Sequence, residues 1–91
     1  MDEKEFCKCV GSVIRELRIN KGFYNLTLFS SKHNIPSSTL SRIEIGQNEP
    51  QLETLKKITD ALGITLKDLF FEVEKNIQNK KPRVSEARNC R

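Results

Sequence analysis

Apolar residues recur at steps of three and four along most of the chain, which is the period of amphipathic α-helices. The first such segment runs from about Glu3 to Lys21. Its repeating positions are Phe6, Val10, Val13, Ile14 and Leu17. Gly22 follows directly, and glycine commonly ends a helix by adopting a left-handed conformation. The pattern therefore predicts a first helix that buries one apolar stripe.

Two short helices joined by a tight turn are expected next. Asn25 is a favoured N-cap residue, and Leu28 and Phe29 are the apolar residues that should face inward. Asn34 suits the end of this helix because asparagine tolerates a left-handed backbone. Pro36 keeps the residue before it extended and is tolerated in a first helical turn, so the next helix should begin there. This order of elements is a helix-turn-helix pattern.

Two further apolar repeats complete the chain's helical pattern. The fourth helix is expected from about Gln51 to Leu62, with Gly63 ending it. The fifth should begin after Thr65, because Thr65 and Asp68 have the spacing of a capping box. The repeating positions are Leu52, Leu55, Ile58, Thr59 and Leu62 in the fourth helix, and Leu66, Leu69, Phe70 and Val73 in the fifth. No segment has the alternation of a strand, so the fold class predicted is all-α, with five helices.

The helix expected over residues 37–45 has an unusual outer face. Leu40 and Ile43 mark its inner side. The outer positions are Ser38, Ser41, Arg42 and Ile45. Small hydroxyls let a flat partner approach closely, serine can bond phosphates or base edges, and arginine can hold guanine by two parallel hydrogen bonds. Taken alone, the stretch fits an ordinary amphipathic helix with a serine-rich surface equally well.

Charge is distributed unevenly along the 91 residues, whose net charge is +4 and whose pI is near 9.1. Residues 1–71 hold ten Lys/Arg and nine Asp/Glu, a net of +1, whereas residues 72–91 hold six and three, a net of +3. A nucleic-acid surface in the helical part must therefore come from the placement of charges rather than from their number. The expected organisation is one domain over 1–78, with its core in 10–71, followed by a basic, disordered tail over 79–91.

Several other classes of protein fit the sequence poorly. No apolar run is long enough for a membrane span or a signal peptide, so we expect a cytoplasmic protein that is nucleoid-associated when bound to DNA. Three cysteines and the single His33 lack the spacing of zinc or redox motifs, so we expect reduced thiols, no metal and no cofactor. No paired carboxylates, activated nucleophile or glycine-rich phosphate loop indicates an enzyme.

A series of motifs occurs in order along two thirds of the chain. It comprises Val-Gly-x-x-Ile-Arg-Glu-Leu-Arg at 10–18, Lys21-Gly22, Ile-Pro-Ser-Ser-Thr-Leu-Ser-Arg-Ile-Glu-x-Gly at 35–46, Glu49-Pro50, Leu-Glu-Thr-Leu at 52–55, Ala-Leu-Gly-Ile at 61–64 and Leu69-Phe70. This series resembles the lambda-repressor-like, Cro/C1-type helix-turn-helix family, also called the XRE family. The resemblance implies a five-helix fold, sequence-specific binding to double-stranded DNA, and usually a homodimer on a near-palindromic operator.

The resemblance also implies roles for individual residues. The residues that match positions facing the major groove are Ser37, Ser38, Ser41 and Arg42, and Ile45 matches a position near the groove edge or the DNA backbone. The loop whose amides approach phosphate is matched by Gln47 and Asn48. The expected DNA-binding set is completed by Asn25 and Thr39. Arg18 and Glu44 match a structural ion pair that links the first and third helices. The last helix is expected to form the dimer surface through Leu66, Phe70 and Phe71, although Phe71 could instead pack beneath the tail.

The turn before the second helix departs from the family pattern. It is one residue longer than usual, so Leu26 occupies the position of a glutamine that often binds phosphate. Asn25 and Tyr24 are the candidates to replace that contact. A second departure is Pro36, which stands where a capping Ser or Thr is common, so the cap shifts to the backbone of Pro36 or to Ser37.

The interpretation that accommodates these features is a transcriptional regulator that binds the major groove with helix 37–45 as a homodimer. It would be a small repressor or a restriction-modification controller, with no small-molecule effector. The alternative is a protein-interaction module with the same fold, such as an antitoxin that holds its toxin through the basic tail. DNA binding should weaken steeply with added salt, whereas an apolar protein contact should not.

Overall fold

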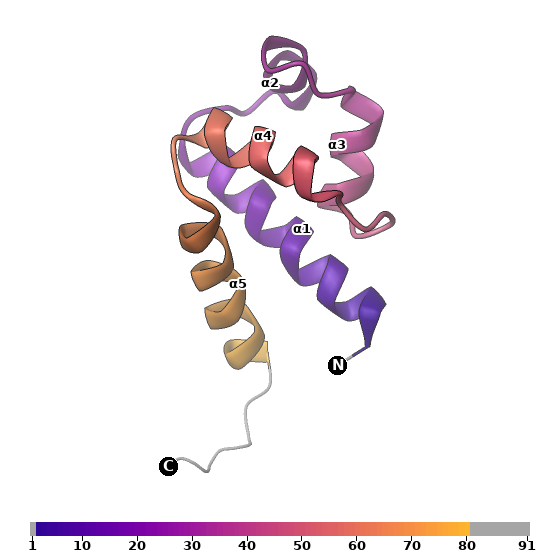
Figure 1. Ribbon diagram of the computed structural model, residues 1–91, viewed down its shortest axis with the longest axis vertical. Helices are drawn as coiled ribbons and strands as arrows, with labels where there is room; N and C mark the ends of the chain where they lie inside the picture. The colour runs from indigo at the N-terminus through magenta and orange to yellow at the C-terminus, as the bar shows by residue number, and fades with distance from the viewer. Residues whose placement is uncertain (1, 81–91) are drawn as a thin grey trace.

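The computed structural model describes residues 2–80, with side chains through residue 78, and these residues form five α-helices without strands (Figure 1). The helices are α1 (Glu3–Asn20), α2 (Leu26–Lys32), α3 (Ser37–Glu44), α4 (Leu52–Leu62) and α5 (Leu66–Lys80). The prediction of an all-α, five-helix fold is therefore confirmed. The tail predicted for 79–91 lies outside the described residues from residue 81 onward, and Cys90 falls within that part.

Local capping explains where several helices begin and end. Asn25 Oδ1 accepts a hydrogen bond from Leu28 N at 2.9 Å and so caps α2. Thr65 Oγ1 accepts from Asp68 N at 3.0 Å, while Asp68 Oδ2 accepts from Thr65 N at 3.3 Å, which is the reciprocal capping box at the start of α5. A similar box at Asp2, which the pattern did not predict, starts α1.

Helix α1 lies at the centre of the fold. It packs against α3 on one side and α5 on another, while α2 rests on α3 and α4 on α5 (Figure 1). The apolar side chains that meet between these helices form one core. Its buried members are Val10, Val13, Ile14, Phe29, Ile35, Leu40, Ile43, Leu55, Ile58, Leu62, Leu69 and Val73. Both helices of the helix-turn-helix are thus supported from behind by the rest of the chain.

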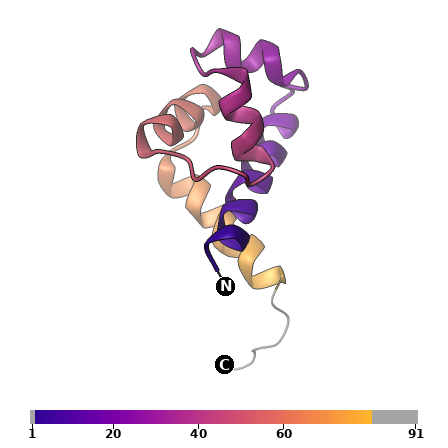
Figure 2. The same ribbon diagram turned by 90° about the vertical axis from the view of Figure 1, so that its right-hand side faces the viewer.

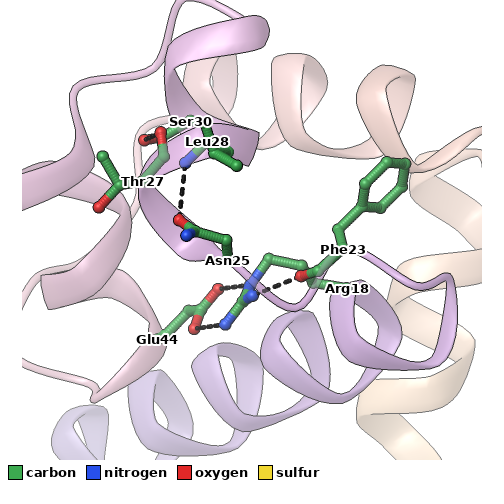
Figure 3. Close-up of polar contacts among 7 residues, drawn as sticks. All are labelled: Arg18, Phe23, Asn25, Thr27, Leu28, Ser30 and Glu44. Carbon is green, nitrogen blue, oxygen red and sulfur yellow. Dashed lines mark hydrogen bonds and ion pairs between the residues drawn. The ribbon is translucent and has the colours of Figure 1, made fainter.

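The inward face of α2 differs from the prediction at Leu28, which is 68% exposed. Phe29 and Ser30 are buried instead, and the Ser30 hydroxyl is satisfied because it donates to Thr27 O at 3.0 Å (Figure 3). Successive residues on a helix point 100° apart, so a buried face centred between Phe29 and Ser30 leaves Leu28 turned away from the core. The prediction of two adjacent inward residues was therefore wrong for one of them.

Three other residues predicted to be buried lie at the ends or edges of their stripes. Phe6 is 41% exposed near the start of α1, Leu52 is 77% exposed as the first residue of α4, and Phe70 is 36% exposed. In α5, Leu69 and Val73 occupy the centre of the buried stripe, which leaves Phe70 at its margin. Within residues 2–80, none of the helices combines the length and apolar character needed to cross a bilayer.

Candidate nucleic-acid interface

The C-terminal end of α3 lies so close to α1 that only glycine fits between them. A Cβ atom placed on Gly11 of α1 would lie 2.8 Å from the carbonyl oxygen of Glu44 and closer still to that of Ile43. Real side chains do not tolerate such contacts with backbone atoms, so Gly11 allows this approach of the two helices. The direction in which α3 presents its outer face therefore depends on a residue of α1.

A buried ion pair joins the same two helices (Figure 3). Arg18 Nε donates to Glu44 Oε2 at 2.8 Å and Arg18 Nη2 donates to Glu44 Oε1 at 3.0 Å, so the pair is bidentate. The third donor, Arg18 Nη1, reaches the carbonyl oxygen of Phe23 at 2.6 Å. Arg18 therefore connects α1, the turn before α2 and the end of α3, and its side chain is only 5% exposed.

The remainder of α3 presents its polar side to solvent. Leu40 and Ile43 are buried, while Ser37, Ser38 and Arg42 are exposed. Figure 2 shows α3 and the segment that joins it to α4 on the side facing the viewer. The other positions matched to DNA-binding residues differ in their exposure. Thr39 and Ser41 are half-buried, and Asn25, Ile45, Gln47 and Asn48 are exposed.

The N-termini of α3 and α4 lack the side-chain caps that begin the other three helices. Their N-cap residues, Pro36 and Gln51, make no capping hydrogen bond through their side chains. Both residues line a single cavity of about 500 Å³ between α3 and α4. Uncharged hydrogen-bonding side chains also line it, namely Thr39, Gln47, Asn48 and Thr54, together with the carboxylate of Glu49. Two helix N-termini whose first backbone amides have no side-chain cap therefore border one hollow, which uncharged side chains line for the most part.

The exposed charged side chains on α2 and α3 are positive. No Asp or Glu occurs between Leu17 and Ile43, a stretch that contains Arg18, Lys21, Lys32 and Arg42. Arg18 is neutralised by Glu44, whereas Lys21, Lys32 and Arg42 are exposed. The exposed charged side chains between Leu17 and Ile43 are thus all positive although residues 1–71 are nearly neutral, and such uneven placement favours a polyanionic partner.

The turn between α1 and α2 carries apolar rather than phosphate-binding side chains. Leu26 is half-buried against the core, and Tyr24 is 76% exposed. With Phe23 and Leu28, Tyr24 lines a shallow groove of about 580 Å³. Asn25 uses its carbonyl oxygen to cap α2, so its amide group is the part of that side chain left for a partner.

The cysteine and histidine side chains of the described residues serve packing. Cys9 is buried and Cys7 half-buried, and both are free thiols. Burial raises the pKa of the Cys7 thiol, and the nearby carboxylates of Glu49 and Glu3 raise it further, so the reactive thiolate is disfavoured at neutral pH. The His33 ring packs 4.9 Å from that of Phe29. Within residues 2–80, no group of three or more His, Cys, Asp or Glu side chains is placed to hold a metal.

Known proteins resemble this chain in sequence and in fold. A family model described as helix-turn-helix matches residues 14–69. The control protein C.MunI from a Mycoplasma species is 34% identical over 65 residues, which cover 71% of this chain and 88% of that protein. The crystal structure of the clp gene regulator ClgR from C. glutamicum superposes with a TM-score of 0.71 and 25% identity, covering 78% of this chain and 90% of that one.

Proposed function

Because the chain belongs to the Cro/C1-type (XRE) helix-turn-helix family of DNA-binding regulators, we propose that it binds specific double-stranded DNA sequences by inserting α3 into the major groove. The observation that carries this proposal is the outer face of α3. Small hydroxyls and Arg42 point to solvent there, while Gly11 and the Arg18–Glu44 pair hold the opposite side against α1. A rigid face of this kind can approach base edges without first paying for its own ordering.

Contacts with the DNA backbone would come from the elements that precede and follow α3 in the chain. The uncapped N-terminus of α4 and the residues Gln47 and Asn48 border the cavity beside α3, and Asn25 caps the start of α2 with its amide group left over. Such groups bind phosphate oxygens and set the orientation of a protein on the duplex, while base contacts provide the specificity. We assign the base contacts to Ser37, Ser38, Ser41 and Arg42, and place Thr39 and Ile45 at the edges of the contact.

The regulatory role proposed is that of a small repressor or a restriction-modification controller. Similarity to a control protein and to a gene regulator supports transcriptional control as the process. The alternative is an antitoxin-type module that binds protein. Duplex binding by the full chain should weaken by orders of magnitude between about 50 and 200 mM salt if several phosphates are contacted. Binding that is unchanged over that range, or absent at low salt, would favour the alternative.

Replacing Arg42 by alanine should weaken binding to the selected operator and remove the preference for one base pair in each half-site. Loss of a bidentate arginine–guanine contact costs about 1–3 kcal/mol of discrimination. The fold should persist because Arg42 is exposed. Competition titrations with single-base operator variants measure the effect, and Lys57→Ala, an exposed cation on α4, is the matched control. Equal loss on all sequences would instead assign Arg42 to a phosphate contact.

We further propose that two copies associate through α5. Phe71 is 62% exposed, Phe70 lies beside it, and Leu66 is half-buried on the same helix. Lys75 Nζ lies 5.3 Å from the centre of the Phe71 ring, so the ring is partly covered by a cation. A dimer would place two recognition helices on half-sites about one helical turn apart, which a single short helix needs for adequate specificity.

Phe71→Asp is expected to convert the dimer into a folded monomer of 10.5 kDa, because a carboxylate at the centre of an apolar contact must be desolvated. Sedimentation equilibrium measures the mass directly. Leu52→Asp provides the control, since Leu52 is also an exposed apolar residue but lies on α4. A wild-type protein that is monomeric at all concentrations, or a Phe71→Asp variant that stays dimeric, would contradict the assignment of this surface.

A further inference from the structure

Ile45 is an apolar side chain held outward at the end of a polar face. It is the C-cap residue of α3, three residues after Arg42, and is 56% exposed. Its backbone is well fixed, since Ile45 N donates to Ser41 O at 3.1 Å. The neighbours on both sides are also held: Glu44 pairs with Arg18, and Gly46 lies so close to Lys8 that a Cβ there would come within 2.9 Å of Lys8 Cα. The exposure of Ile45 therefore follows from the packing around it and not from a frayed helix end.

The major groove offers an apolar group that an isoleucine can contact, namely the C5-methyl of thymine. Helix α3 rises about 1.5 Å per residue, so Ile45 lies about 4.5 Å beyond Arg42, which is comparable to the spacing of about 3.4 Å between successive base pairs. We propose that Ile45 contacts the C5-methyl of a thymine adjacent to the guanine bound by Arg42. This inference rests on the proposed function. The protein would then distinguish thymine from cytosine at that position by one apolar contact.

Deoxyuridine tests this inference because it differs from thymidine only in lacking the methyl group. The operator is first obtained by selecting duplexes from random DNA with the full chain, and each half-site thymine is then replaced singly by deoxyuridine. One thymine next to the Arg42-dependent base pair should be sensitive. Its replacement should weaken wild-type binding roughly four-fold per half-site, as expected when one apolar carbon is no longer buried in the complex.

Two variants locate the contact. Ile45→Ala should bind the thymine and deoxyuridine operators equally, while circular dichroism shows an unchanged helix content. Leu28→Ala removes an apolar side chain that is 68% exposed on α2 and should keep the full discrimination. If no thymine is sensitive, if the operator has none at that position, or if Ile45→Ala still discriminates, the inference is overturned while sequence-specific binding stands. Failure to enrich any sequence would instead overturn the proposed function, and this inference with it.

Discussion

Glu44→Ala should lower the free energy of unfolding by about 3–5 kcal/mol, because it leaves the guanidinium of Arg18 buried without its counter-ion. The two carboxylate oxygens of Glu44 accept hydrogen bonds at 2.8 and 3.0 Å, and both side chains are at most 5% exposed. A loss of this size is a large part of the stability of a small domain. Thermal and urea denaturation followed by circular dichroism measure it.

Two further variants separate the effect of losing the ion pair from other effects of the Glu44→Ala substitution. Glu53→Ala removes an exposed carboxylate from the first turn of α4 and should change stability by less than about 1 kcal/mol. Combining Glu44→Leu with Arg18→Met should recover part of the loss, since an apolar pair of similar volume avoids the unpaired charge. If Glu44→Ala melts at the wild-type temperature, the ion pair does not hold α3 against α1.

Gly11→Ala is expected to destabilise the protein by about 3 kcal/mol or more, although alanine favours helices. Intrinsic propensity alone would predict a gain of about 1 kcal/mol for this change in a helix interior. The added Cβ, however, would meet the carbonyl oxygens of Ile43 and Glu44, which are backbone atoms that cannot rotate away. The cost of forcing an extra group into a packed site should exceed the gain in propensity.

The measurement is the unfolding free energy of Gly11→Ala beside that of Ser12→Ala. Ser12 is the next residue of α1 and is half-buried, so its replacement reports the helix propensity without the collision. Ser12→Ala should be neutral or slightly stabilising. A Gly11→Ala protein as stable as the wild type would mean that α1 and α3 can move apart at little cost, and that Gly11 does not position the outer face of α3.

The helices were predictable from the sequence because their signals are local. Periodic apolar residues and caps such as Asn25 and Thr65 lie within a few positions of the features that they determine. Periodicity does not show which of two neighbouring apolar residues will be buried. Leu28 and Phe70 each sit beside a residue that occupies the centre of its stripe, and both are exposed. That choice depends on the direction from which other helices pack.

The parts of the candidate site that depend on distant contacts were not predictable from spacing. Arg18 and Glu44 are 26 residues apart, and the expectation that they pair came from the family resemblance alone. The collision that would follow from a Cβ on Gly11 involves carbonyl groups of another helix, for which the sequence gives no signal. The cavity between α3 and α4, with uncapped N-termini opening toward it, likewise appears only when both helices are placed.

The central claim is that the outer face of α3 contacts DNA. The most direct test records the amide resonances of the isotope-labelled full chain during titration with a duplex. Resonances of residues 37–42 and 45–48 should shift most, and those of α5 should change little, because α5 is assigned to the contact between copies. Shifts confined to α4 and α5, with residues 37–42 unmoved, would show that the duplex binds elsewhere and would contradict the account.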